Sequence, residues 1–267
     1  MIIDDIDFAE LYRSHIGQAS RRSKPAEDWD KRAEDMAKSC ANPNDPYVRT
    51  FIKPMILDGA ATLLDVGCGP GTIALPLASK FKEVYALDYS QKMLDVLKMR
   101  AKNENIGNVT TILKSWNDDW RDVPQCDIAV ASRATMVDDL KDALEKISNK
   151  ARLWVYTTFT VDRHFIDPKI IACLRRKAVG FPNYIYAVNL LHAMGYRPRV
   201  DYITTTMCKK KPAGLEGFLS SVVWSVGDIS EEEKKKLKNY YQEHVDVQER
   251  SDTFERTWAY VYWSTMK

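Results

Sequence analysis

Short apolar runs alternate with amphipathic stretches between about residues 60 and 160. The apolar runs have the length and composition of buried strands and cover residues 62–66, 83–87, 109–113, 126–131 and 152–159. The stretches 71–80, 90–103 and 138–149 are predicted helices, and in the second of them apolar residues such as Met93 and Leu97 recur at helical spacing. Strands that alternate with helices in this way predict a parallel sheet with right-handed crossovers.

The two ends of the chain have a different character. Residues 1–50 are polar and helical in pattern, and the sequence Asn-Pro-Asn-Asp-Pro at 42–46 is a turn signal. We interpret this turn as the join between an N-terminal arm and the core. Beyond the alternating region, the pattern predicts a helix at 183–194, a strand at 199–207, helices near 213–224 and 230–243, and a final strand at 253–265.

The composition is that of a folded globular protein, with 45% hydrophobic and 28% charged residues in a chain of 267. The 39 basic and 37 acidic residues give a net charge of +2, which does not by itself indicate a nucleic-acid partner. No apolar run is long enough to cross a bilayer, and the start of the chain is acidic where a signal peptide is basic. The five cysteines include no C-x-x-C pair. We therefore expect a cytoplasmic protein with reduced thiols and no membrane partner.

The most informative stretch is Leu-Asp-Val-Gly-Cys-Gly-Pro-Gly at 64–71, placed where a strand turns into a helix. Glycines there let the backbone approach a ligand closely, and the helix that follows offers unpaired N–H groups. Asp88 ends the next strand, 21 residues after Gly67, where a carboxylate can accept hydrogen bonds from both hydroxyls of a ribose. A dinucleotide fingerprint would need a third glycine at position 72, which is Thr72, so a nucleotide-dependent oxidoreductase is disfavoured.

The G-x-G-x-G spacing resembles the first motif of the class I S-adenosylmethionine-dependent methyltransferases, (L/V)LD-x-G-x-G-x-G. Residues 87–94 resemble the second motif of that class, in which an acid ends the second strand. The resemblance covers roughly residues 60–160. It implies an α/β fold with a doubly wound, mostly parallel, seven-stranded Rossmann-like sheet, an N-terminal helical arm or lid (1–50), a methyltransferase domain (51–267) and helical lid insertions. It also implies S-adenosylmethionine as the cofactor.

The resemblance assigns roles to individual residues. Asp65 would orient the glycine loop or contact the amino group of the cofactor, and Asp88 would bind the ribose hydroxyls. Met93 would pack on the adenine. The other cofactor-binding residues that the two motifs imply are Gly67, Cys68, Gly69, Gly71 and Tyr89.

The loops after the third and fourth strands depart from the pattern of the family. The acid that usually reads the adenine is displaced or missing, so Ser115, Trp116 and Asn117 are the candidates; Trp116 either stacks on adenine or fills the core. The loop that begins Ser132-Arg133 should face the sulfonium. Arg133 is predicted either to bind an acidic substrate or to form a surface salt bridge. This loop lacks the (D/N/S)PP(Y/F/W) motif, which disfavours DNA adenine, other exocyclic amines and protein glutamine as acceptors.

The N-terminal arm carries a second group of candidate residues. The sequence Trp-Asp-Lys-Arg-Ala at 29–33 resembles the helix that closes over the cofactor in many small-molecule methyltransferases. Trp29 and Arg32 lie three residues apart, on one helical face. Trp29 would wall the pocket and Arg32 would pair with the carboxylate of the cofactor. On this hypothesis the core stays folded without residues 1–40; the alternative is an arm that packs only for stability.

The other charged features of the sequence say little about function. The triplets Arg175-Arg176-Lys177 and Lys209-Lys210-Lys211 could contact phosphates but favour a solvated surface, so nucleic-acid contact is not the preferred interpretation. The run at 231–236 places opposite charges three and four residues apart, as in an exposed helix. No metal site is predicted, because no metal-ligand spacing joins any of the four histidines, His15, His164, His192 and His244.

A methyl group on a sulfonium is already activated, so transfer requires mainly in-line positioning of the acceptor. A base is needed only for an acceptor that arrives protonated, and the candidate base is His164, after the fifth strand. Arg133 is the second catalytic candidate. Aromatic residues between 159 and 186 favour a small, partly apolar acceptor in a closed pocket. The alternatives are RNA or protein methylation and a non-catalytic S-adenosylmethionine-binding protein. The pattern does not determine the oligomeric state.

Overall fold

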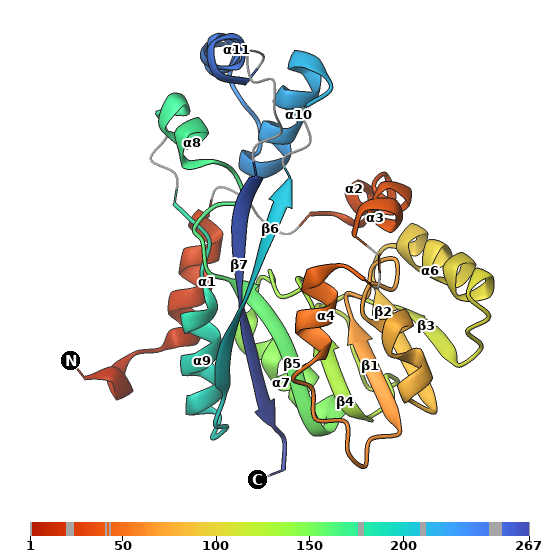
Figure 1. Cartoon of the computed structure of the whole chain (residues 1–267). Helices are drawn as coiled ribbons and strands as arrows, with labels where there is room; N and C mark the ends of the chain where they lie inside the picture. The colour runs from red at the N-terminus through yellow and green to blue at the C-terminus, as the bar shows by residue number, and fades with distance from the viewer. Residues whose placement is uncertain are drawn as a thin grey trace.

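The computed structural model describes residues 2–19, 24–40, 42, 44–175, 179–208, 212–245 and 253–266. Within these ranges the chain forms a twisted sheet with helices on both faces (Figure 1). The triplet at 209–211 and two residues of the other basic triplet, Arg176 and Lys177, lie outside the described residues.

The sheet of the described chain has seven strands in the order β3-β2-β1-β4-β5-β7-β6. Strands β1 to β5 pair in parallel, whereas β7 is antiparallel to both of its neighbours. This confirms the expected doubly wound, mostly parallel, Rossmann-like sheet. The strand order reverses between β1 and β4, where folds of this kind bind ligands. The strands are β1 (Thr62–Val66), β2 (Glu83–Asp88), β3 (Val109–Leu113), β4 (Cys126–Ala131), β5 (Ala151–Thr160), β6 (Arg199–Cys208) and β7 (Thr253–Ser264).

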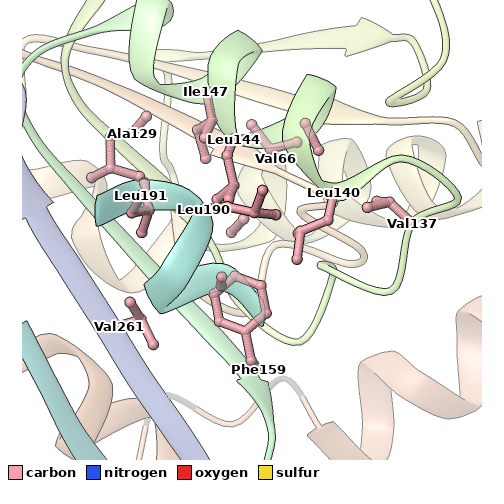
Figure 2. Packing of buried hydrophobic residues seen from close by; sticks show 14 of the residues in the cluster. Val66, Ala129, Val137, Leu140, Leu144, Ile147, Phe159, Leu190, Leu191 and Val261 are labelled. Carbon is pink, nitrogen blue, oxygen red and sulfur yellow. The ribbon is translucent and has the colours of Figure 1, made fainter. Parts of the chain in front are cut away.

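Helices α1 (Phe8–Gln18), α7 (Leu140–Lys150) and α9 (Tyr184–Ala193) cover one face of the sheet. Successive strand residues point to opposite faces, so Leu64 and Val66 pack on this side. Figure 2 shows Leu144 of α7 and Leu190 of α9 meeting in this cluster. The shared apolar core anchors the loop that follows β4, which begins on this face.

The opposite face is covered by α4 (Pro46–Ile52), α5 (Ala74–Leu77) and α6 (Gln91–Asn103). Leu63 and Ile128 point to this side and pack with Phe51 of α4. Asp45 caps α4 by accepting from the Tyr47 N–H, and Ser90 caps α6 by accepting from the Met93 N–H. Both caps fix the start of a helix close to the carboxyl ends of the strands.

Two groups of helices lie outside these layers. Helices α2 (Ala26–Asp30) and α3 (Ala33–Cys40) pack against α6. Helices α8 (Pro168–Leu174), α10 (Gly214–Val226) and α11 (Glu231–Tyr240) share a small apolar core of their own beyond one end of β6 and β7 (Figure 1). We call this group the helical cap. No helix among the described residues has both the length and the apolar character to cross a membrane.

The structure differs from the sequence predictions in three places. The helix expected at 71–80 begins at Ala74 and ends in a 3₁₀ turn at Ala78–Lys80, because Gly71 has a φ of +84° and the loop is still turning there. Helix α8 was not predicted, since it is only seven residues long and its apolar side packs with α10 and α11 in the helical cap. The helix expected to carry Trp29 and Arg32 on one face is interrupted, because α2 ends at Asp30 and α3 begins at Ala33.

The described part of residues 1–50 packs as three separate pieces of structure. Helix α1 buries Tyr12 and Ile16 on the α7–α9 face, and the Tyr12 hydroxyl donates to the Val137 carbonyl at 2.7 Å. Helix α4 buries Tyr47 and Phe51 against the opposite face. Only α2 and α3 therefore remain as the part of this segment that could close over a ligand.

Candidate cofactor and acceptor site

The glycine loop lies between β1 and α5 and approaches two other loops closely. The N–H groups of Gly67 and Cys68 both donate to the carbonyl of Leu87, at 2.7 and 3.0 Å. A Cβ on Gly67 would lie 2.3 Å from the Cβ of Ala134, in the loop after β4. Gly67 therefore allows three strand ends to converge, which sequence spacing alone does not reveal.

Asp88 joins this loop to the end of β2. One carboxylate oxygen accepts from the Gly69 N–H at 2.8 Å, and the other accepts from the Ser90 N–H at 2.9 Å. The side chain is 6% exposed, and burial raises its pKa. These bonds hold the carboxylate at the wall of the cavity, where its remaining lone pairs can accept from a ligand.

Asp65 is the most buried carboxylate of the site, with 1% of its surface exposed. It accepts from the Ala74 N–H at 3.0 Å, at the start of α5. Its pKa is raised to about 7, mainly by burial, with a contribution in the same direction from the nearby charge of Asp88. A cationic ligand beside this pair would favour the ionised carboxylates.

A cavity of about 560 Å³ opens above these residues, a size typical of small-molecule sites. Most of the candidate cofactor residues line it. They are Asp65, Gly67, Cys68, Gly69, Asp88, Tyr89, Met93, Ser115, Trp116, Asn117, Ser132 and Trp29. The sequence thus identified one wall of the cavity.

Trp116 packs against the core and also lines the cavity. It lines the cavity, stacks on Trp120 with ring centroids 5.1 Å apart, and donates from Nε1 to the Ala134 carbonyl at 2.9 Å. The neighbouring Ser115 and Asn117 share a turn, because the Asn117 N–H donates to the Ser115 hydroxyl. The indole is held by core contacts while one side faces the space available to a ligand.

The α2–α3 segment is tied to the end of β2 by hydrogen bonds. The Tyr89 hydroxyl donates to the Lys24 carbonyl at 2.8 Å, and the Ser90 hydroxyl donates to Asp30 at 2.6 Å. Met93 packs in a small cluster with residues of α3. The segment is therefore held over the cofactor side of the cavity.

Trp29 and Arg32 converge on one residue of the helical cap. The Trp29 ring meets the Trp224 ring edge-on at 5.5 Å, and the Arg32 guanidinium lies 4.1 Å above the same ring. Lys24 approaches Trp224 from another side, at 4.8 Å. Trp29 and Trp224 line the cavity, whereas Arg32 does not appear in its described lining. Arg32, in the turn between α2 and α3, thus contacts α10 through a cation–π interaction.

Gly71 and His164 also lie outside the described lining of the cavity. A Cβ on Gly71 would lie 2.8 Å from the Leu75 side chain, so this glycine serves the packing of the loop on α5. His164 contacts the ring of Phe181 edge-on, and burial lowers its pKa. His192, His15 and His244 are dispersed, and the described residues hold no cluster of three metal-ligating side chains.

Behind Ser132, the end of β4 carries a buried chain of hydroxyl groups. The Tyr47 hydroxyl lies 2.7 Å from the Ser132 hydroxyl and 2.9 Å from that of Thr158. Arg133 has a φ of +57°, and its backbone N–H donates to Thr158. Its guanidinium lies 4.2 Å over the Tyr47 ring, and Arg133 is part of the cavity lining. The salt bridge foreseen as an alternative for Arg133 is not formed with any described carboxylate.

Sequence reasoning anticipated only part of the far wall of the cavity. Phe165, in the segment after β5, was among the aromatic residues expected near the acceptor, whereas Trp224 of α10 and Arg256 and Trp258 of β7 were missed. Because β7 is antiparallel, its first residues lie beside the last residues of β5, as the pairing of Trp258 with Thr160 shows. An arginine within a strand of aromatic and β-branched residues was the signal that could have indicated this wall.

Comparison with known proteins agrees with this arrangement. A family model described as "Methyltransferase domain" matches residues 63–152. An uncharacterised protein of Haemophilus influenzae is 39% identical over 264 residues, which cover 99% of this chain and 98% of that protein. A Methanobrevibacter smithii protein named "Probable cobalt-precorrin-6B C(15)-methyltransferase (decarboxylating)" is 29% identical over 58% of this chain and 83% of its own length.

A solved structure shares the fold across most of the chain. It is phosphoethanolamine N-methyltransferase 2 of Haemonchus contortus, in complex with phosphomonomethylethanolamine and S-adenosylhomocysteine. The TM-score is 0.52 at 16% identity, over 91% of this chain and 60% of that chain. At this identity the likeness concerns the fold.

Proposed function

Since this chain belongs to the Rossmann-like, S-adenosylmethionine-dependent methyltransferases, we propose that it methylates a small molecule held in the part of the cavity beyond the cofactor residues. The observation that carries the proposal is the lining of that part. Phe165, Trp224 and Trp258 wall it with aromatic rings, and all three follow the segment that the family model matches. An enclosed aromatic wall suits a small, partly apolar acceptor better than an exposed macromolecular surface.

When bound, S-adenosylmethionine supplies a methyl group that is already activated on its sulfonium. The residues of the chain bind and orient it. Asp88 would accept hydrogen bonds from the ribose hydroxyls, and Asp65 would face the positive charges of the methionine part. Trp29 and Trp116 would exclude water from the two sides of the cavity.

On the acceptor side, Ser132 is the polar group best placed to contact the reacting molecule. Its hydroxyl lines the cavity and is held from behind by the Tyr47 hydroxyl. Burial raises the pKa of Tyr47, which keeps its phenol neutral and able to donate. We therefore assign Ser132 to orienting the acceptor by a hydrogen bond. In-line positioning then supplies most of the catalysis.

The names of two similar proteins support a small acceptor, since one refers to a cobalt-precorrin and the other is bound to phosphomonomethylethanolamine. The test uses methyl-labelled S-adenosylmethionine and a cell extract separated into small-molecule, RNA and protein fractions. We expect label to accumulate in the small-molecule fraction with the wild-type protein and to be lost with Asp88→Ala. Label confined to RNA or protein would refute the small-molecule proposal. Cofactor binding without any transfer would favour a non-catalytic binding protein.

A further inference from the structure

The far wall of the cavity carries a row of aromatic rings with an arginine at each end. The Arg133 guanidinium lies 4.2 Å over Tyr47, whose ring centroid is 6.5 Å from that of Trp258. Trp258 in turn lies 5.9 Å from Phe165, and the Arg256 guanidinium is 5.0 Å from the Phe165 ring. The row joins α4, the end of β4, the start of β7 and the segment after β5.

Four members of this row line the cavity, namely Arg133, Phe165, Arg256 and Trp258. Three acids among the described residues line the cavity: Asp65 and Asp88 lie at the ends of β1 and β2, and Asp138 lies in the segment after β4. Arg133 is exposed to the cavity and pairs with no carboxylate of the described chain. The wall formed by Arg133, Phe165, Arg256 and Trp258 is therefore aromatic and carries two guanidinium groups.

Arg256 is partly buried and held in place by its own contacts. One terminal nitrogen donates to the Phe165 carbonyl at 2.8 Å. Burial lowers the pKa of this guanidinium, and the charge of Asp162 acts in the opposite direction. Arg256 lines the cavity with this contact in place, and a guanidinium has five N–H donors in a planar fork. A partly desolvated cation of this kind binds an oxyanion more strongly than an exposed one does.

We infer that the methyl acceptor carries a carboxylate or phosphate group that Arg133 or Arg256 binds, next to an apolar, ring-sized body that packs on Trp258 and Phe165. This inference rests on the proposed function, since it names the class of its acceptor. Arginine suits this role because its planar fork matches the geometry of both oxyanions. The aromatic rings between the two arginines supply the apolar contact.

Binding probes test the inference without knowledge of the natural acceptor. Benzoate and phenyl phosphate are titrated by calorimetry into the protein saturated with S-adenosylhomocysteine, and benzyl alcohol serves as the neutral probe. We expect at least one anionic probe to bind at least tenfold more tightly than benzyl alcohol. Comparison of benzoate with phenyl phosphate distinguishes a carboxylate from a phosphate.

The variants Arg133→Met and Arg256→Met keep an apolar side chain but remove the charge. At least one of the two should weaken the anionic probe at least tenfold, and both should leave the affinity for S-adenosylhomocysteine within twofold, while Arg256→Lys should bind the probe at least as tightly as Arg256→Met. Arg199→Met is the matched control, because Arg199 stacks on Trp154 and Tyr262 away from the cavity. Its probe affinity should equal that of the wild type.

Three results would overturn the inference. The first is no preference for the anionic probes, and the second is unchanged probe affinity in both methionine variants. The third is a loss of S-adenosylhomocysteine affinity as large as the loss of probe affinity, which would assign the arginines to the cofactor. A separate arm applies the labelled small-molecule product to an anion exchanger at pH 8. Retention supports the inference, whereas a labelled small molecule in the flow-through refutes it and leaves the proposed function standing. Label only in RNA or protein refutes the proposed function instead.

Discussion

Asp65 should make the stability of the folded protein depend on pH between about 4 and 7. Burial raises its pKa from 3.8 to about 7 in the folded chain. Between these two values the folded state holds a proton that the unfolded state has released. The contribution of Asp65 to the free energy of unfolding is therefore fully present below pH 4 and is lost as the pH rises through 7. A difference of about three pKa units corresponds to roughly 4 kcal/mol.

The substitution Asp65→Asn isolates this effect, because asparagine cannot ionise but keeps an oxygen that can accept from the Ala74 N–H. Between pH 5 and pH 8 the wild type should lose about 3 kcal/mol that the variant does not lose. The measurement is urea unfolding of both proteins without cofactor at the two pH values. The quantity compared is the difference in unfolding free energy between variant and wild type, since other titrating groups largely cancel in it.

Asp127→Asn is the control for this experiment. Its carboxylate accepts from the N–H groups of Ala61 and Thr62 and pairs with Arg152, and its pKa is lowered to about 2. Asp127 is thus ionised in both states throughout the window, and its loss should change the unfolding free energy equally at pH 5 and pH 8. If Asp65→Asn behaved in the same way as this control, the raised pKa of Asp65 would be refuted.

Four further outcomes follow from the structure. Asp88→Ala should weaken S-adenosylmethionine binding by about 1–3 kcal/mol in calorimetry, the scale of lost charge-assisted hydrogen bonds; unchanged affinity in a folded variant would contradict this role. Gly69→Val should abolish cofactor binding and keep the circular dichroism spectrum of a folded protein, because the branched side chain would enter open space beside the loop and strain a backbone with a φ of +52°; Gly67→Ala should lower the melting temperature through its clash with the loop after β4. Trp224→Ala should cost about 1–2 kcal/mol of cofactor affinity by releasing the α2–α3 segment; wild-type affinity would show that this contact does not hold the segment closed. Removing residues 1–40 should cause aggregation or a large fall in melting temperature, because α1 is part of the core; a stable truncated protein would contradict this.

The cofactor side of the site was accessible to sequence reasoning because its residues are local. The spacing from Asp65 to Gly69, followed by Asp88 at the end of the next strand, is set by one strand–loop–helix–strand unit. Chain connectivity alone brings these residues together, as the hydrogen bond from Gly69 to Asp88 shows. The periodicity of apolar residues likewise predicted all seven strands, including the two at the end of the chain.

The N-terminal segment shows where a local pattern was insufficient. Its polar composition suggested one movable arm, yet Tyr12 is buried between α1 and α9 and bonded to Val137, 125 residues away in the chain. A few apolar residues on one helical face are enough to dock a mostly polar helix. Composition does not specify which surface they will meet.

By itself, the sequence determined the alternation of strands and helices that makes a parallel sheet, the glycine loop and the pair of carboxylates, since local spacing and the handedness of βαβ units leave few alternatives. Only the tertiary structure decided what faces them. The antiparallel entry of β7 brings Arg256 and Trp258 beside the end of β5, and α10 brings Trp224 to Trp29 of the arm. These contacts join residues more than 90 positions apart in the chain, and they depend on which helix and strand surfaces bury one another.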